Sequence, residues 1–243
     1  MATVCRHSPQ PGLVVLRLNR PERRNALDSA TLALLIGQLE ELAGDPELRV
    51  LVLSSTSPRA LCAGADVAEV LDHEDGLARM RAFSRLYSLL ESFPAPTVCV
   101  CVGNCVGAGA ELVAGCDLRV GADNLLLAWA GARLGVPVGV ARLVPLVGLA
   151  RAKELIFTGR TVGGAEAQSL GLLTRHVAAA DAETVALELA EELAAHPPEG
   201  MRRLKEMFRD FESGAQRVAR ENALLEDFQR HGVGLPSGGS PSG

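Results

Sequence analysis

Residues 97–117 read TVCVCVGNCVGAGAELVAGCD, and this stretch decides the fold class. It overlaps the longest uncharged run of the chain, residues 92–110, which matches a membrane helix in length. Pro94, Pro96 and Gly103 interrupt that run, and prolines and glycines at such spacing break helices. The β-branched residues before Gly103 and the small residues after it predict a strand, a turn and the start of a helix.

The residues upstream repeat this alternation of strand and helix. Residues 13–18, LVVLRL, and residues 50–53, VLVL, are short apolar runs of the kind found in buried strands. Between them, residues 28–44 predict a helix, because leucines recur there at three- and four-residue steps along one face. A strand, a helix and a second strand in this order predict a parallel pair with the helix packed across it.

The downstream residues extend the α/β pattern and then become helical. A helix is predicted over 77–90, and short strands near 118–120 and 125–127. Most of the chain beyond residue 139 has helical spacing, including residues 181–195 and 214–230. We therefore expect an α/β core over 1–180 and a helical region over 181–231. Residues 232–243 are rich in Gly, Ser and Pro and predict a disordered tail.

Composition excludes several classes of function. Of the 243 residues, 48% are hydrophobic and 22% are charged, and the net charge of -5 comes without any long basic run. We expect neither nucleic acid nor a membrane as a partner. The six cysteines form no CxxC pair and have no histidine at ligand spacing, so they predict free thiols and no metal site. No apolar leader is present near the first residues, and we expect a cytoplasmic protein.

Two segments place small residues where a strand or loop gives way to a helix. They are residues 61–67, LCAGADV, and residues 103–112, GNCVGAGAEL. If the N–H groups of Ala65 and Ala108 face one point, they can form an oxyanion hole, where each donor contributes roughly 2.7–4 kcal/mol. Glu111, one turn into the second helix, would act there as acid or base. Either segment alone also fits a packing role, and a glutamate near a helix start also complements the helix dipole.

Taken together and in this order, the motifs resemble the crotonase (enoyl-CoA hydratase/isomerase) superfamily. The resemblance covers about residues 3–230. The residues that carry it are Asn19-Arg20-Pro21, Asn25-Ala26-Leu27, Cys62-Ala63-Gly64-Ala65-Asp66, Gly107-Ala108-Gly109-Ala110-Glu111-Leu112, Cys116-Asp117, Thr158-Gly159-Arg160, Ala165-Glu166-Ala167 and Gly171-Leu172.

The resemblance implies a spiral core of ββα repeats, with C-terminal helices that join three copies into a trimer, often paired into a hexamer. It also implies a bent acyl-CoA thioester whose carbonyl oxygen lies between the N–H groups of Ala65 and Ala108. Coenzyme A is then part of the substrate, and no separate cofactor is needed. Further contacts with coenzyme A are expected from Ala63, Asp66, Val67 and, at the phosphates, Arg24. Asp66 also fits a structural role as a helix cap.

Two departures from the family pattern bear on the reaction. Family hydratases hold a water between two glutamates; Glu111 matches the first, but Gly131 stands at the second position. Losing an acid–base group costs roughly 10²–10⁴ in rate. Trp129 would line the acyl pocket that Gly131 opens, or pack in the core. The family also adds a C-terminal helix over coenzyme A, whereas this chain turns to Gly, Ser and Pro after residue 231.

We therefore expect an enoyl-CoA hydratase or dehydratase of fatty acid metabolism that works with Glu111 as its single retained carboxylate. An isomerase, a decarboxylase or a thioester hydrolase would share the oxyanion hole and need fewer carboxylates. A non-catalytic acyl-CoA-binding subunit is the alternative from another class, suggested by Gly131 and the short C-terminus. The sequence leaves the acyl group, and the choice between trimer and hexamer, open.

Overall fold

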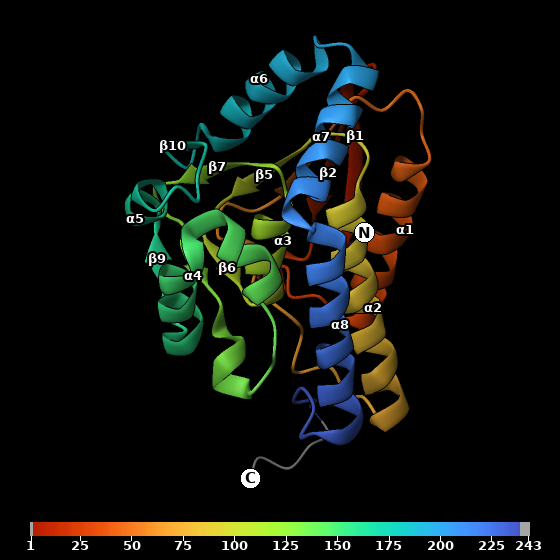
Figure 1. Ribbon diagram of the computed structural model, residues 1–243, viewed down its shortest axis with the longest axis vertical. Coiled ribbons are helices and arrows are strands. Elements are labelled where there is room, and N and C mark those ends of the chain that lie inside the picture. The colour runs from red at the N-terminus through yellow and green to blue at the C-terminus, as the bar shows by residue number, and fades with distance from the viewer. Residues whose placement is uncertain (1, 239–243) are drawn as a thin grey trace.

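The computed structural model describes residues 2–238, and a six-stranded sheet forms its centre (Figure 1). Its strands lie in the order β1-β2-β3-β5-β7-β10. Strand β1 is antiparallel to β2, and every other neighbouring pair is parallel. The parallel α/β architecture predicted from the sequence is confirmed. The strands are β1 (Val4–Gln10), β2 (Leu13–Leu18), β3 (Val50–Ser55), β5 (Thr97–Cys101), β7 (Leu118–Ala122) and β10 (Arg175–Val177).

Helices cover both faces of this sheet, because alternate residues of a buried strand point to opposite sides. In β2, Leu13 and Val15 face a cluster that contains helix α6 (Ala182–Ala194). Val14 and Leu16 face the larger cluster on the other side. That second cluster is built from α1 (Ser29–Ala43), α2 (His73–Ser92) and α3 (Ala108–Gly115).

A second, four-stranded sheet carries the loops that matter for function. Its order is β4-β6-β8-β9, and β4, β6 and β8 are parallel to one another. Parallel neighbours end at the same edge of a sheet, so the residues that follow these three strands are brought side by side. The strands are β4 (Ala60–Cys62), β6 (Asn104–Val106), β8 (Leu126–Ala128) and β9 (Val162–Gly163).

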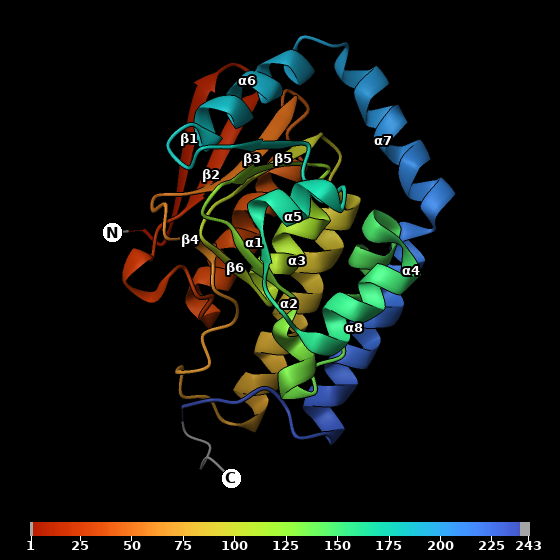
Figure 2. The same cartoon turned by 90° about the vertical axis from the view of Figure 1, so that its left-hand side faces the viewer.

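The C-terminal half is helical, as predicted. Figure 1 shows α8 (Gly214–His231) beside α2, and Figure 2 shows α7 (Pro198–Glu212) as an arm that leaves the body and runs past α4 (Val140–Thr158). The remaining helical segments are η1 (Pro21–Arg23), η2 (Ala130–Leu134) and α5 (Gly164–Ser169). Within residues 2–238, no helix has both the length and the apolar character that crossing a bilayer requires.

The structure differs from the sequence prediction at both ends of the chain. Strand β1 was not predicted, because its exposed, polar residues show no apolar alternation and it forms by pairing with β2. The disordered tail predicted for 232–243 is corrected as far as Gly238, because Leu235–Gly238 bond to the body through main-chain groups that composition does not reveal. Residues 239–243 lie outside the described residues. The boundary at residue 180 stays a prediction.

Candidate functional site

Three loops meet at the edge where β4, β6 and β8 end. They are residues 63–65, 107–108 and 129–131, each following directly on its strand. Ala63, Gly64, Ala65, Gly107, Ala108 and Gly131 from these loops line one cavity of about 250 Å³. Side chains from α2, α8 and residues 134–138 complete its wall. Two segments that are more than forty residues apart in sequence therefore form one site, as the prediction required.

The main-chain amide of Ala65 is turned away from the neighbouring strand-like segment. Leu27 N–H donates to the Gly64 carbonyl at 2.8 Å, and Asp66 N–H donates to the Leu27 carbonyl at 2.9 Å. These bonds make Leu27 and Ala65 a parallel bridge pair. In a parallel ladder the residue between the two bonded ones presents its own N–H to the opposite side. Ala65 lines the cavity, and its N–H lies on the side away from Leu27.

The amide of Ala108 is available for a different reason. Ala108 is the first residue of α3, and the first N–H groups of a helix have no intrahelical acceptor. The loop before it is fixed by a 3.0 Å hydrogen bond from Gly107 N–H to the Ala128 carbonyl. Gly64 has a φ of +107°, and a Cβ on it would lie 3.1 Å from the Val106 carbonyl oxygen. The two loops are therefore in main-chain contact.

Glu111 is fully buried on α3 and pairs with Arg142 of α4. Arg142 Nε donates to Glu111 Oε2 at 2.5 Å, and Arg142 Nη2 donates to Glu221 Oε1 at 2.6 Å. Glu221 Oε2 accepts from Ala141 N–H at 2.8 Å, and the Trp129 indole lies beside the Glu111 carboxylate. Burial raises the pKa of Glu111 to about 7; Glu221 adds to the shift and Arg142 opposes it. Two carboxylates thus share one guanidinium.

Glu111 lies behind the cavity wall rather than in it. It is not among the residues that line the cavity, whereas Val136 and Val138 are. A Cβ placed on the next residue, Gly139, would lie 3.2 Å from Glu111 Oε1. The segment 136–139 therefore contacts both the cavity, through Val136 and Val138, and Glu111, through Gly139.

Gly131, which stands at the position of the second glutamate, and Trp129, two residues before it, have different surroundings. Gly131 lines the cavity, and a Cβ on it would lie 3.1 Å from the Val136 carbonyl oxygen and from Val138 Cγ1. Trp129 is buried in the core cluster and does not line the cavity. Its indole lies near Gly139, on the Glu111 side of the wall. Trp129 packs in the core beside Glu111, and its part in lining the acyl pocket stays a prediction.

The four residues expected to contact coenzyme A lie together at one side of the cavity. Ala63 and Val67 line it. The exposed residue Arg24 is held next to Ala63 by a 3.0 Å hydrogen bond from Ala63 N–H to the Arg24 carbonyl. Asp66 is buried and accepts from Arg20 Nη1 at 2.6 Å. Burial acts to raise the pKa of Asp66, but the hydrogen bonds from Arg20 and Ala68 N–H and the charges of Arg20 and Arg23 together outweigh it, and the pKa is lowered. Its contact with coenzyme A stays a prediction.

Several residues of the site were missed by the sequence analysis. Met80, Phe83 and Tyr87 of α2 line the cavity, and Tyr87 is the one polar side chain among its described lining residues. Their spacing of three and four residues predicts only an apolar helix face, so it carried no functional signal. Leu235 from the tail also lines the cavity. Burial raises the pKa of nearby Cys62 to about 12, which excludes a thiolate nucleophile at neutral pH.

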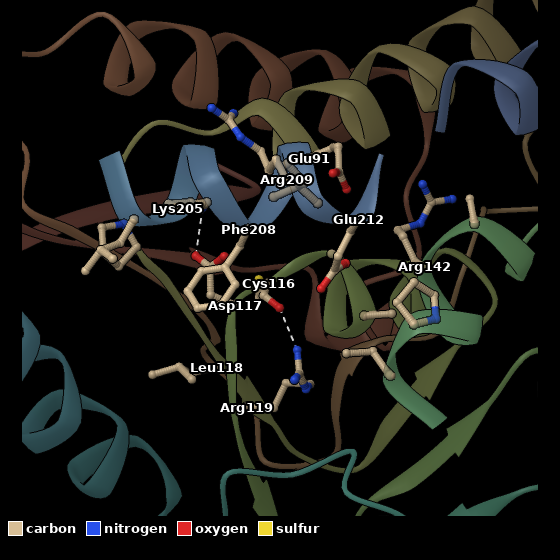
Figure 3. Close-up of a pocket in the computed structure, with 18 of the residues that line it drawn as sticks. Glu91, Cys116, Asp117, Leu118, Arg119, Arg142, Lys205, Phe208, Arg209 and Glu212 are labelled. Carbon is tan, nitrogen blue, oxygen red and sulfur yellow. Dashed lines mark hydrogen bonds and ion pairs between the residues drawn. The ribbon is translucent and has the colours of Figure 1, made fainter. Parts of the chain in front are cut away.

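A larger cavity of about 460 Å³ lies on another side of the molecule, under α7 (Figure 3). Phe208 and Lys205 of α7 line it, and Lys205 Nζ pairs with Asp117 at 2.7 Å. Arg142 borders it as well. Neither Ala65 nor Ala108 reaches this cavity. The smaller cavity, which Ala65 and Ala108 line, and the cavity beneath α7 are therefore separate.

Comparison with known proteins agrees with this architecture. The family model for enoyl-CoA hydratase/isomerase matches residues 9–232. Enoyl-CoA hydratase domain-containing protein 2, mitochondrial, of Bos taurus is 38% identical over 192 residues, which are 76% of this chain and 64% of the bovine protein. The chain thus spans less than two thirds of that relative. The 2,3-dehydroadipyl-CoA hydratase of Escherichia coli is 30% identical over 225 residues, 91% of this chain and 86% of that protein.

Solved structures give the same result. An enoyl-CoA hydratase from Bacillus anthracis superposes with a TM-score of 0.82 at 28% identity, covering 97% of this chain and 99% of that one. A monofunctional enoyl-CoA isomerase from M. smegmatis superposes with a TM-score of 0.75 at 26% identity, covering 90% and 99%. The crotonase-like fold is confirmed, and the chain belongs to the enoyl-CoA hydratase/isomerase family.

Proposed function

We propose that this protein binds an acyl-CoA thioester and holds the thioester carbonyl oxygen between the N–H groups of Ala65 and Ala108. The observation that carries the proposal is that the two loops bearing these amides, far apart in sequence, line one cavity. Amides fixed in this way stabilise negative charge on oxygen without reorganising during the reaction. Ala63, Val67 and Arg24 would contact coenzyme A, with Arg24 at the phosphates.

The reaction that we propose is the hydration of an enoyl-CoA or its reverse. Water adds its oxygen to the β carbon, the carbonyl oxygen carries the enolate charge between the two amides, and the α carbon then takes up a proton. Glu111 suits proton exchange because burial raises its pKa to about 7, close to neutral pH.

A second candidate is an acyl-CoA-binding protein without turnover. One observation favours it: the described residues lining the cavity include no carboxylate, and Glu111 is paired with Arg142 behind the wall. Binding needs the amides and the apolar wall but not an acid–base group. The same oxyanion site also serves isomerisation, decarboxylation or thioester hydrolysis, which product mass separates from hydration.

The test combines turnover and binding on one panel of CoA thioesters. Mass spectrometry of the products detects a gain of water, a loss of carbon dioxide or hydrolysis, and an unchanged mass with a shifted double bond marks isomerisation. Glu111→Gln should lose most hydration while calorimetry still detects the CoA ester, and Glu188→Gln, the same change at an exposed position of α6, should behave as wild type. Equal turnover in Glu111→Gln would reject its role. Binding with no turnover by the wild type would favour the second candidate.

We also propose that the protein forms the homotrimer or hexamer expected from the family. The apolar side chains exposed on α7 support this: Met207 is 52% exposed, Phe208 67% and Phe211 84%. Exposed apolar patches of this kind mark interaction surfaces. Light scattering should give a mass of three or six chains, and Phe211→Glu should lower it; a monomeric wild type would contradict the proposal.

The cytoplasmic location stays a prediction, and the bovine and mouse relatives carry the word mitochondrial in their names.

A further inference from the structure

Helix α8 carries a buried carboxylate that the reaction proposed above does not use. Glu221 is 6% exposed and does not line the cavity of the proposed active site. Its Oε1 accepts from Arg142 Nη2 at 2.6 Å, and its Oε2 accepts from Ala141 N–H at 2.8 Å. Burying an ion is costly unless other groups replace its water, and here two donors from the start of α4 do so.

The Arg142 guanidinium connects Glu221 to Glu111. Its Nη2 bonds to Glu221, and its Nε bonds to Glu111 Oε2 at 2.5 Å. The guanidinium also lies over the Tyr87 ring, with its carbon 4.4 Å from the ring centre. Because a guanidinium is planar and rigid, the bond to Glu221 fixes the direction in which Nε points toward Glu111.

Glu221 is itself held in place, because the next residue anchors α8 on α2. Asn222 is buried, and its Nδ2 donates to the Ser84 carbonyl at 2.9 Å and to Ser88 Oγ at 3.0 Å. The two helices lie side by side in Figure 1. Glu221 is therefore fixed on the body of the molecule and not on a free helix.

Glu221 also holds the start of α4, where Arg142 lies. Ala141 belongs to the first turn of α4, and N–H groups there have no acceptor within their own helix. Glu221 supplies that acceptor, and Arg217 of α8 donates through Nε to the Ala141 carbonyl at 3.2 Å. Side chain and main chain next to Arg142 are thus both bonded to α8.

Of the titratable groups around Glu111, two carry charge near neutral pH. Arg142 of α4 and Glu221 of α8 act on it, and Tyr87 of α2 lies beside them, next to Cys62 of β4. Burial raises the pKa of Tyr87 well above its ordinary value and that of Cys62 to about 12, so both stay neutral. Burial raises the pKa of Glu111 most, Arg142 lowers it and Glu221 raises it further. Of these groups, Glu221 brings the second negative charge.

We propose that Glu221 is a positioning residue for Glu111 and acts on it through the Arg142 guanidinium. The proposal rests on the proposed function, because it treats Glu111 as the acid–base group of the reaction. Glu221 orients Arg142, Arg142 orients the Glu111 carboxylate, and the negative charge of Glu221 favours the protonated form of Glu111. A general acid or base depends on both its position and its protonation. A C-terminal helix therefore tunes a group that belongs to α3.

The first test is Glu221→Gln, which keeps the size of the side chain and removes its charge. One carboxylate and one guanidinium remain in the cluster, so the variant should fold. With an enoyl-CoA ester, kcat should fall about 10- to 100-fold, because a misplacement of about 1 Å costs on the order of 10²-fold. KM, and ester affinity from calorimetry, should stay near wild type. The change of kcat with the ionisation of Glu111 should move to lower pH, since removing a nearby negative charge lowers the pKa of Glu111.

A second readout needs no turnover. Glu111→Gln removes the titration of Glu111, so the difference in unfolding free energy between this variant and its parent isolates that titration. Between about pH 5 and about pH 8 this difference should rise less in the Glu221→Gln background than in the wild-type background, because the pKa of Glu111 then lies closer to its ordinary value. Urea titrations of the four proteins measure both differences. Equal rises in the two backgrounds would overturn the proposal.

Three further variants on α8 separate positioning from a purely structural role. Asn222→Ala removes the bonds to Ser84 and Ser88 and should lower the melting temperature without moving the pH profile of kcat. Glu226→Gln is the matched substitution at a partly exposed position and should behave as wild type. Glu221→Asp keeps the charge and should keep the wild-type pH profile. If Asn222→Ala or Glu221→Asp moves the profile as far as Glu221→Gln does, the proposal is overturned.

The outcome for the wild type distinguishes this proposal from the proposed function. If the wild type converts esters and Glu221→Gln leaves kcat and its pH profile unchanged, the positioning role is overturned and the proposed function stands. A wild type that neither binds nor converts any ester overturns the proposed function, and the positioning role with it.

Discussion

Arg142 Nε lies 2.5 Å from Glu111 Oε2, and both side chains are almost fully excluded from solvent. The same guanidinium also pairs with Glu221 and lies over the Tyr87 ring. Removing ions from water is costly, so a buried carboxylate depends on its partner. This pair connects α3, which bears the Ala108 amide, to α4 and α8. The stability of the C-terminal helices is therefore coupled to the geometry of the proposed active site.

Replacing Arg142 by methionine should destabilise the fold by about 3–5 kcal/mol, because it leaves two buried carboxylates without their shared cation. The free energy of unfolding from urea titration measures the effect. Arg85→Met is the control: Arg85 also pairs with a glutamate, Glu40, but both side chains are largely exposed. Exposed pairs contribute little, so its stability should stay close to that of wild type. Similar losses in the two variants would show that the buried cluster has no special role.

The stability of the fold should depend on pH through Glu111. Its pKa is raised from an ordinary value of 4.5 to about 7, chiefly by burial. Between these values the folded chain binds a proton that the unfolded chain has released. The free energy of unfolding should therefore fall as pH rises through this window, by about 3 kcal/mol in total.

Glu111→Gln removes this titration, so its stability relative to wild type should increase from about pH 5 to about pH 8. Urea titrations of both proteins at several pH values measure the difference. Titrating groups far from Glu111 contribute equally to the two proteins and cancel. A difference that is constant across the range would mean that Glu111 ionises in the folded chain as it does in the unfolded one.

Gly109→Ala should disturb the site although it adds only a methyl group. A Cβ on Gly109 would clash with the Cys62 carbonyl, which belongs to β4. Forcing the helix and strand apart should cost about 1–3 kcal/mol and lower turnover by displacing the amides of Ala65 and Ala108. Gly37→Ala is the same change within α1, where nothing lies within 4 Å. It should stabilise the fold by about 0.5–1 kcal/mol. In thermal denaturation the melting temperature should fall for Gly109→Ala and rise for Gly37→Ala. An unchanged melting temperature in Gly109→Ala would contradict the close approach of Gly109 to the Cys62 carbonyl.

Tyr87→Phe should lower turnover while leaving the fold intact. The ring would keep its contact with Arg142 and its stacking on Phe83, whose centroid is 6.0 Å away. The variant loses the one hydroxyl among the described cavity residues. If this hydroxyl bonds to the ester or to the attacking water, its loss, about 1 kcal/mol, should lower kcat/KM about fivefold. Steady-state kinetics with unchanged melting temperature would support the role, and wild-type kinetics would assign Tyr87 to packing alone.

Local patterns predicted most of the regular structure. The apolar runs at 13–18 and 50–53 became β2 and β3, and the leucine spacing of 28–44 became α1, whose first turn is capped by Asp28 through Thr31 N–H at 2.8 Å. The close approach of the loops that carry Ala65 and Ala108 could also be expected, because clusters of Gly and Ala after a strand allow main chains to approach each other closely. These features depend on neighbours in sequence, so the sequence contains their signal.

Features that depend on distant partners could not be predicted. Arg142 and Glu221 are separated by 79 residues, and neither position differs in pattern from an ordinary helix surface. The position of Glu111 behind residues 136–139 is set by the path of that loop, which no periodicity describes. Leu235 looked disordered because composition alone ignores main-chain bonds such as that from Gly238 to Glu69.

The parallel ends of β4 and β6 have a consequence for genetic variation in this protein. The proposed carbonyl-binding groups belong to the main chain, so no substitution at Ala65 or Ala108 short of proline deletes them. Glycine at either position keeps the amide and adds no atoms to the cavity, so these variants should stay active, whereas larger side chains would occupy the cavity that both alanines line. Damaging changes should concentrate where spacing between strand and helix is set, as at Gly64 and Gly109. Tolerance of a substitution at a position would then say little about how close that residue lies to the reacting atoms.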